Sequence, residues 1–365
     1  MKIVISGVSL TEGGILSILQ DCAKAAQKIA DEHEFIFLVH DRKLMDIDDS
    51  RFIVREYPEI KQSWSKRLHF EYLYCKQLSK ELKPDVWISL HDMTPNVSVG
   101  RQYVYCHNPS PFFRTKLSDV FIDHKLFLFS LFYKYLYGIN IKRNKYVIVQ
   151  QNWLREAFHK MYGVDTIVAY PSVELPEIII NESKSDSITQ PFTFFYPSFP
   201  RIFKNFEVLM EAAALLATRR IDFQVIITIE SSQNTLAEQL VNKYKKCNQI
   251  KFIGKQTRNE VYTIFNNCDC LVFPSKLETW GLPLTEAKMF KKPILVADLP
   301  YAHENIQDYQ SAKFFEPDNV EMLASYMDKL IDGRLLYDKN IATVPVSPFY
   351  RQWDELMKFL VTDKR

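Results

Sequence analysis

The stretch that decides the fold runs from Cys270 to Glu304 and reads CLVFPSKLETWGLPLTEAKMFKKPILVADLPYAHE. Its first apolar residues, Cys270–Phe273, predict a buried strand that ends in a loop. A helix is predicted to begin near Leu282, because Pro283 then stands in its first turn, where the missing N–H costs nothing. The stretch therefore predicts a strand, a loop and a helix in direct succession, which is the building block of an open α/β sheet.

Two carboxylates flank this loop. Glu278 lies on it, and Glu286 lies near the start of the helix, whose side chains tilt back toward the loop. Both are expected to face the edge at which open α/β sheets bind ligands. Carboxylates accept hydrogen bonds from paired hydroxyls of a ribose or a hexose, and the amides of Gly281, Leu282 and Leu284 would form a helix N-terminus suited to a diphosphate. The same spacing also fits two solvated acids, since glutamate is common in first helical turns.

Apolar runs alternate with helical patterns along the whole chain. At 365 residues the sequence is too long for one ordinary core and fits two domains. The runs are nearly continuous in their apolar character, as in parallel strands covered by helices on both faces. They comprise residues 2–5, 35–39, 86–89, 103–106 and 146–149 in the first half, and 192–196, 223–228, 250–253, 270–273 and 293–296 in the second. The sequence therefore predicts an α/β fold with two Rossmann-like, doubly wound domains.

The domain boundaries follow from composition. A first domain is predicted over 1–171 and a second over 191–342. Residues 172–190 are predicted to be the linker, because they hold prolines, serines and charges with little periodicity. A final amphipathic helix is predicted over 349–361, and the end of the chain, 349–365, is expected to pack back on the first domain.

Composition and charge exclude several classes of protein. The net charge of +2 gives no reason to expect nucleic acid as a partner. No window of about 18 residues is continuously apolar and the N-terminus does not read as a secretory signal, so a cytoplasmic location is predicted. Of the six cysteines, only Cys268 and Cys270 are close in sequence. They alternate with apolar residues, which is typical of reduced core thiols and a weak indication of zinc.

The segment from Pro274 to Glu304 resembles the signature of the retaining family 4 glycosyltransferases, also described as glycosyl transferases group 1. The characteristic positions are occupied by Glu278, Gly281, Leu282, Pro283, Glu286, Pro293, Pro300 and Glu304. The resemblance implies the GT-B fold, in which two Rossmann-like domains face each other across a cleft that holds the active site. It also implies transfer of a hexosyl group from a UDP- or GDP-linked sugar to an acceptor hydroxyl with retention, in the synthesis of a cell-surface polysaccharide or glycolipid.

The resemblance assigns roles on the donor side. Glu278 is expected near the anomeric centre of the transferred sugar, and Glu286 at the ribose hydroxyls of the nucleotide. Residues 252–255, with Gly254 and Lys255, are expected to run past the base. These are expectations of the family pattern, carried over position by position.

The family uses a lysine and an arginine for the diphosphate, in place of a metal. Lys204, before Asn205, matches the lysine, whereas Arg201 stands displaced from the usual position of the arginine. Arg201 is expected to take that role from a shortened loop, and the alternative is a solvated turn. The turn with Gly13 and Gly14 resembles the family's glycine turn, which faces the phosphates and the sugar of the donor.

Polar residues follow two predicted strands of the first domain. His107 and Asn108 come after the strand 103–106, where a functional polar group would be placed. The family often carries a histidine at this edge, so the resemblance implies that His107 contacts the hydroxyls of the donor sugar. His91 and Asp92 follow the strand 86–89, and they are acceptor-side candidates together with Asn108.

Cofactors, partners and competing functions complete the prediction. No D-x-D is expected on a strand-end loop of the kind that chelates a metal-bound diphosphate, and His and Asp residues form no clustered ligand set, so no metal and no cofactor are expected. The aromatic and basic segment 114–146 fits either peripheral contact with the inner face of a membrane, near a glycan or lipid-linked acceptor, or the core of the first domain. Two other functions share the predicted fold: a sugar-nucleotide 2-epimerase and a catalytically silent scaffold subunit. The oligomeric state stays open.

Overall fold

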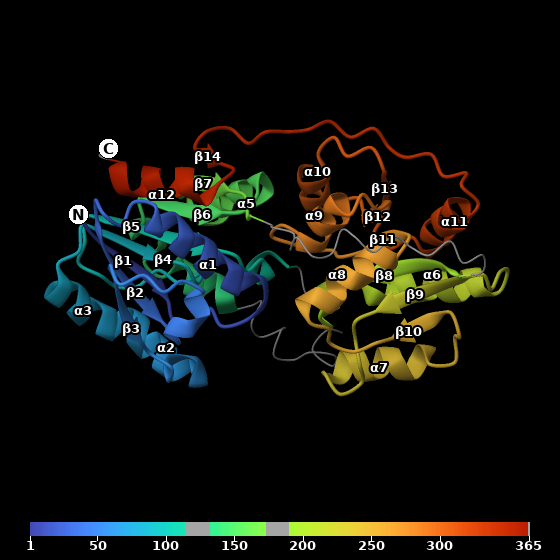
Figure 1. Ribbon diagram of the computed structural model, residues 1–365, viewed down its shortest axis with the longest axis horizontal. Coiled ribbons are helices and arrows are strands. Elements are labelled where there is room, and N and C mark those ends of the chain that lie inside the picture. Colours follow the sequence, from blue (N-terminus) through green and yellow to red (C-terminus); the bar gives the residue numbers. More distant parts are fainter. Residues whose placement is uncertain (114–131, 173–189, 364–365) are drawn as a thin grey trace. The chain divides into compact units, whose positions relative to one another are not determined.

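The computed structural model describes residues 1–113, 132–172 and 190–363. Among these residues, 1–112, 132–172 and 344–363 form a first compact unit, and 113 and 190–343 form a second (Figure 1). The interior of the predicted linker 172–190 and the first part of the aromatic segment, 114–131, lie outside the described residues. Both units are α/β structures, and they are described separately below.

The first unit is built on one parallel sheet with the strand order β14-β7-β6-β5-β4-β1-β2-β3. The strands are β1 (Lys2–Gly7), β2 (Glu34–Val39), β3 (Phe52–Glu56), β4 (Val86–Ser89), β5 (Arg101–Cys106), β6 (Tyr146–Val149), β7 (Thr166–Ala169) and β14 (Phe349–Tyr350). The five strands predicted for this half are confirmed. The other three lie at the two edges of the sheet or next to an edge, and they are short or mixed in polarity.

Helices cover both faces of this sheet, as near-continuous apolar strands require. They are α1 (Gly13–Gln27), α2 (Trp64–His69), the π-helix η3 (Phe70–Tyr74), α3 (Cys75–Leu82), α5 (Asn152–Tyr162) and α12 (Trp353–Thr362); residues 132–138 are also helical. Ile3 and Ile5 of β1 pack with α1 and α12, whereas Val4 packs on the opposite face with η3 and α3. Alternate side chains of one strand thus enter two cores.

The end of the chain differs from the prediction. The helix predicted from residue 349 begins at Trp353, because Phe349–Tyr350 instead pair with β7 as the edge strand β14. Helix α12 then packs against α1 (Figure 1). The indole of Trp353 stacks on the ring of Tyr105 with the centroids 5.5 Å apart. The first unit therefore contains both the start and the described end of the chain.

The second unit is built on a six-stranded parallel sheet with the order β10-β9-β8-β11-β12-β13. Its elements are β8 (Phe192–Tyr196), η8 (Ile202–Lys204), α6 (Phe206–Ala217), β9 (Phe223–Ile227), α7 (Thr235–Tyr244), β10 (Ile250–Phe252), α8 (Arg258–Asn267), β11 (Cys270–Phe273), α9 (Leu282–Met289), β12 (Ile294–Ala297), α10 (Pro300–Ile306), β13 (Ala312–Phe315) and α11 (Val320–Ile331). All five predicted strands are confirmed. Cys268 and Cys270 are buried in the core of this unit and are not part of a disulfide.

Candidate active site

Lys204 and Glu278 form the central polar contact of the second unit. Their strands, β8 and β11, are neighbours in the sheet and run parallel, so the loops that follow them leave the same edge side by side. Lys204 Nζ lies 2.5 Å from Glu278 Oε1, and the two side chains are 18% and 12% exposed. The structure thus brings together a cation and a carboxylate that lie 74 positions apart in the sequence.

Backbone contacts fix the two loops to each other. Asn205 ends η8 in the left-handed region at φ +54°, and its side-chain amide donates to the carbonyls of Pro274 (3.2 Å) and Pro317 (2.6 Å). The amide of Lys276 donates to the carbonyl of Phe203 at 2.7 Å. These bonds join the loop that carries Lys204 to the loop that carries Glu278. The backbone therefore holds the two side chains of the ion pair in place.

The turn before α9 depends on glycine. Gly281 has φ +80°, and a Cβ at this position would lie 3.2 Å from Phe273 Cε1 and 3.3 Å from Leu284 Cδ1. Asn305 of α10 holds the turn in place by donating to the carbonyl of Trp280 at 2.9 Å. Helix α9 begins at Leu282 as predicted, with proline in its first turn.

One of the three amides assigned to a diphosphate is used within the chain. The amide of Leu284 donates to the carbonyl of Gly281 at 2.9 Å, and the Leu284 side chain is fully buried. The first turn of α9 therefore closes on itself at Leu284. The amides of Gly281 and Leu282 keep their predicted role as an expectation.

Glu286 is buried on the inner side of α9, where it is 9% exposed. Burial raises the pKa of its carboxyl to about 7, although Arg258 and the hydroxyl of Tyr262 both favour the ionised form. Arg258 Nε in turn donates to Tyr262 Oη at 2.6 Å. The two side chains of α8 thus orient the Glu286 carboxylate and control its charge near neutral pH.

The remaining donor-side candidates surround the same edge of the sheet. Arg201 is exposed and lies directly before η8, with its guanidinium 5.3 Å from the ring centroid of Phe199. Gly254 follows β10 with φ +70°, and a Cβ there would lie 3.2 Å from the carboxylate of Glu230. Lys255, next to it, is exposed. Each of these residues lies beyond the carboxyl end of its strand.

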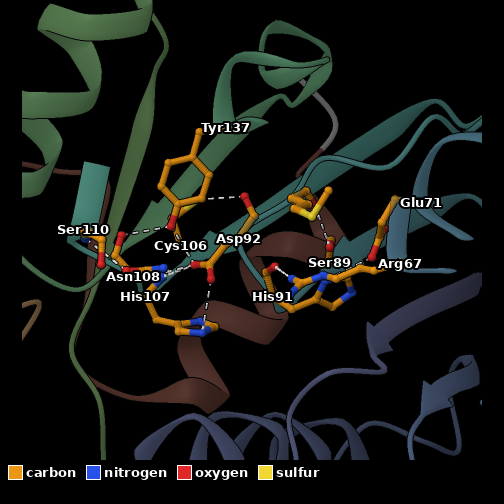
Figure 2. Close-up of polar contacts among 11 residues, drawn as sticks. Arg67, Glu71, Ser89, His91, Asp92, Cys106, His107, Asn108, Ser110 and Tyr137 are labelled. Carbon is orange, nitrogen blue, oxygen red and sulfur yellow. Dashed lines mark hydrogen bonds and ion pairs between the residues drawn. The ribbon is translucent and has the colours of Figure 1, made fainter. Parts of the chain in front are cut away.

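Asp92 organises the polar residues of the first unit (Figure 2). Its Oδ1 accepts hydrogen bonds from the amides of His107 (2.8 Å) and Asn108 (3.1 Å) and from the hydroxyl of Tyr137 (2.8 Å). Its Oδ2 lies 3.4 Å from His107 Nε2. Burial lowers the pKa of His107, while the Asp92 carboxylate opposes that shift. The structure therefore brings the predicted His107, Asn108 and Asp92 together, and Asp92 positions the loop after β5.

His91 was predicted at the rim of the sheet, and this prediction is wrong because its side chain is fully buried. The imidazole Nε2 lies 3.0 Å from Ser6 Oγ and Nδ1 lies 3.2 Å from Glu71 Oε1 (Figure 2). Burial lowers the pKa of His91 and raises that of Glu71 to about 8, so both are neutral at pH 7. Arg67 donates to the carbonyl of His91 at 2.7 Å. His91 is therefore part of the interior and not open to an acceptor.

Glu71 reaches the interior because the helix that carries it contains a π-turn. The π-helix η3 lies between α2 and α3, and the extra residue of such a turn changes which side chains point inward. Asn96 bonds the carbonyls there: its amide donates to Glu71 O at 2.9 Å and its side chain to Tyr72 O at 3.3 Å. The sequence offers no periodic signal for this turn, so the Glu71–His91 pair could not be predicted.

The predicted glycine turn of the first unit opens α1. Gly13 has φ +65° and is the first residue of the helix, followed by Gly14. A Cβ on Gly13 would meet nothing within 4 Å, so the space beside it is open. Backbone conformation and not packing therefore explains the glycine at this position.

Clustered metal ligands and helices able to span a membrane are both absent from the described residues. Within residues 1–113, 132–172 and 190–363, no three His, Cys, Asp or Glu side chains gather in a way that could hold a metal ion. No helix in the same described ranges is both long and apolar enough to span a bilayer. In 132–146, Phe132 and Tyr135 are exposed, whereas Tyr133 and Tyr137 are buried.

Comparison with known families identifies one match. Residues 179–343 match the model of the family described as glycosyl transferases group 1. The O-antigen chain mannosyltransferase RfbU of Salmonella typhimurium is 22% identical over 244 residues, which cover 64% of this chain and 65% of that enzyme. The alpha-D-kanosaminyltransferase of Streptomyces kanamyceticus is 22% identical over 149 residues, 40% of this chain and 39% of that enzyme. The chain thus spans less than two thirds of these relatives.

Solved structures establish the fold. The glycosyltransferase WaaG, involved in lipopolysaccharide biosynthesis, matches with a TM-score of 0.65 at 16% identity over 90% of each chain. The lipopolysaccharide outer core galactosyltransferase WaaB matches with a TM-score of 0.63 at 15% identity over 100% of each chain. Anabaena HepE, solved with UDP-glucose, gives 0.62 at 15% identity over 91% of this chain and 90% of that one. The predicted α/β fold with the two Rossmann-like units of GT-B glycosyltransferases is confirmed.

Proposed function

Because residues 179–343 belong to the glycosyl transferases group 1, we propose that this protein transfers a hexosyl group from a UDP- or GDP-linked sugar to an acceptor hydroxyl with retention. The observation that carries the proposal is the Lys204–Glu278 pair at the carboxyl edge of the second sheet, beside the turn of Gly281. A cation, a carboxylate and a helix N-terminus are the groups that a diphosphate and a sugar require. In this proposal no metal and no cofactor takes part.

The residues divide the donor between them. Lys204 and Arg201 stabilise the negative charge that grows on the diphosphate as the glycosidic bond breaks. Glu278 accepts hydrogen bonds from sugar hydroxyls, and Glu286 accepts those of the ribose. The backbone at Gly254 and Lys255 runs past the base of the nucleotide. His107 contacts the donor sugar.

In this proposal, retention is taken from the resemblance to the family and not from the contacts. The acceptor oxygen bonds to the anomeric carbon on the face that the diphosphate leaves, and the bond from that carbon to the phosphate oxygen breaks. The proton of the acceptor hydroxyl passes to the departing phosphate oxygen. The acceptor is a glycan or a lipid-linked glycan in this proposal, since RfbU and WaaB carry names that refer to such polymers. The proposed location is the cytoplasm, at the inner face of the membrane, with contact through 114–146.

The proposal is tested first by binding. UDP, GDP and their common sugars are added singly, and a ligand of the native state raises the unfolding temperature. We expect one nucleotide class to stabilise the protein and the same sugar-nucleotide to be consumed only when acceptor is present. Consumption of the donor without acceptor would favour a 2-epimerase instead. Absence of any response to every nucleotide would favour a scaffold.

Substitutions then test the site. Lys204→Ala and Glu278→Ala are each expected to lower turnover by at least a hundredfold while the protein stays folded. The matched controls are Lys276→Ala and Asp318→Ala, which remove a neighbouring ion pair of the same two charge types. Turnover in the controls should stay within a factor of two. Turnover near the wild-type rate in either site variant would contradict the assignment.

A further inference from the structure

The proposed function assigns Lys204 to the diphosphate of the donor. In the structure, Lys204 is already paired with the carboxylate of Glu278. We infer that Glu278 makes the site discriminate between the sugar-carrying donor and the nucleoside diphosphate that is left after transfer. This inference rests on the proposed function and concerns the same site. It gives Glu278 a role in substrate selection that is separate from its contact with the sugar.

The geometry makes the two anions competitors. Glu278 Oε1 lies 2.5 Å from Lys204 Nζ, which is the distance of a short charge-assisted hydrogen bond. Glu278 thereby takes one of the three N–H donors of the ammonium and offsets its charge, so a diphosphate on Lys204 competes with Glu278 for that charge. Both side chains are mostly shielded from water, at 18% and 12% exposure, so the exchange is between two partners and not between a partner and bulk solvent.

If a diphosphate displaces Glu278 from Lys204, the described loop of Glu278 offers no other ammonium that is unoccupied. The neighbouring Lys276 is bound to Asp318, and its backbone amide holds the carbonyl of Phe203. Two buried tyrosines close to Glu278 are also engaged, since Tyr196 donates to the carbonyl of Lys204 (2.8 Å) and Tyr301 donates to that of Ser275 (2.6 Å). None of these three neighbours is a donor that could replace Lys204, so we assign that part to the hydroxyls of the ligand.

A sugar donor and a spent nucleotide differ in this respect. The sugar brings hydroxyls that can donate to Glu278 when the diphosphate takes Lys204, so the carboxylate exchanges one partner for another. The nucleoside diphosphate brings no such hydroxyls, so its binding leaves a shielded carboxylate without a donor. Such a loss weakens binding roughly tenfold or more. Glu278 thus favours the donor over the product and speeds the release of the product.

The experiment compares nucleotide binding in Glu278→Gln and in the wild type by calorimetry, using UDP, GDP and the corresponding sugar donors. Glutamine keeps an oxygen that accepts from a hydroxyl, but it does not compete for an ammonium with a full charge. We expect the variant to bind the nucleoside diphosphate roughly tenfold more tightly, and its preference for the sugar donor to fall by the same factor. Asp318→Asn, the matched control, should leave both affinities unchanged.

A second pair of variants tests the mechanism itself. In a Lys204→Met background the gain from Glu278→Gln should vanish, because there is no ammonium left to compete for. Glu278→Asp keeps the charge on a shorter side chain, so its gain should be smaller than that of Glu278→Gln. Thermal unfolding of each variant shows that it is folded before binding is measured.

The outcomes separate the two hypotheses. If no nucleotide binds the wild type, the proposed function fails. If a nucleoside diphosphate binds the wild type and Glu278→Gln equally, the proposed function stands and this inference is overturned. A tenfold gain that Asp318→Asn reproduces, or that survives in the Lys204→Met background, would be a general charge effect and would also overturn it.

Discussion

Replacement of Glu71 with glutamine is expected to stabilise the first unit, by an amount that increases with pH. The carboxyl is fully buried, and burial raises its pKa from the ordinary 4.5 to about 8. The groups around it are His91, Tyr72, Cys75 and Arg67, of which only Arg67 is charged at neutral pH. Burial also raises the pKa values of Tyr72 and Cys75, so these two stay neutral.

The sign and size follow from proton linkage. Between pH 4.5 and about 8 the folded protein holds a proton on Glu71 that the unfolded chain releases, so stability falls as the pH rises through this window. At about 1.4 kcal/mol for each pH unit, the cost is roughly 3 kcal/mol at pH 7 and about 1 kcal/mol at pH 5. Glutamine has the same shape and no proton to hold, so it removes this cost. His91 titrates in both proteins, and its contribution largely cancels in the comparison.

The assay is urea unfolding at pH 5, 6, 7 and 8, followed by tryptophan fluorescence. Four of the five tryptophans belong to the first unit and report on its unfolding: Trp64, Trp87, Trp153 and Trp353. Glu81→Gln is the matched control, because Glu81 is also on this helical segment but its side chain is 61% exposed. A difference between Glu71→Gln and wild type that stays constant from pH 5 to 8 would refute the reasoning, as would an equal response in the control.

Two further predictions concern the second unit. Gly281→Ala should destabilise this unit by roughly 1–3 kcal/mol, because the new Cβ meets Phe273 in a backbone region that alanine avoids. Gly333→Ala is the control for strain alone, since its Cβ would meet nothing within 4 Å. An equal loss of unfolding temperature in both variants would contradict the packing argument. Affinity for a sugar donor should rise up to roughly tenfold from pH 6 to 8 as Glu286 ionises through its pKa of about 7. Glu286→Gln should abolish this dependence of affinity on pH. A wild-type affinity that stays constant from pH 6 to 8 would contradict the prediction.

Most strands could be predicted because a strand that is buried on both faces is a nearly continuous run of apolar residues in the sequence. Ten apolar runs became ten parallel strands, and the two sheets follow from them. The edge strands could not be predicted in this way. Ile53 of the edge strand β3 is 44% exposed. A strand that is covered on one face only has both polar and apolar residues, so it lacks a continuous apolar run. Phe349 and Tyr350 continue a helical pattern in the sequence, and only their pairing with β7 turns them into a strand.

The candidate site was predictable in its members and less so in their surroundings. Glu278 and Glu286 are predicted from the end of a strand and the start of a helix, whereas Lys204 is predicted from the resemblance to the family pattern. The partners that position them lie on other elements, as Tyr262 does for Glu286 and Asn305 does for the turn at Trp280. No spacing along the chain relates such pairs, because sheet order decides which loops become neighbours.

The exposed fractions decide how the two polar clusters should be interpreted. His91 follows the carboxyl end of β4, and Lys204 and Glu278 lie beyond those of β8 and β11, so position alone would make each pair a candidate binding site. In the first unit, Glu71 and His91 are fully buried and uncharged at pH 7, and a ligand could reach them only by opening the core. In the second unit, Lys204 and Glu278 form an ion pair whose side chains keep 18% and 12% of their surface in solvent. Ligand chemistry requires access as well as suitable groups, so the Lys204–Glu278 pair is the better candidate for exchange with a diphosphate, whereas the Glu71–His91 pair belongs to the interior of the first unit.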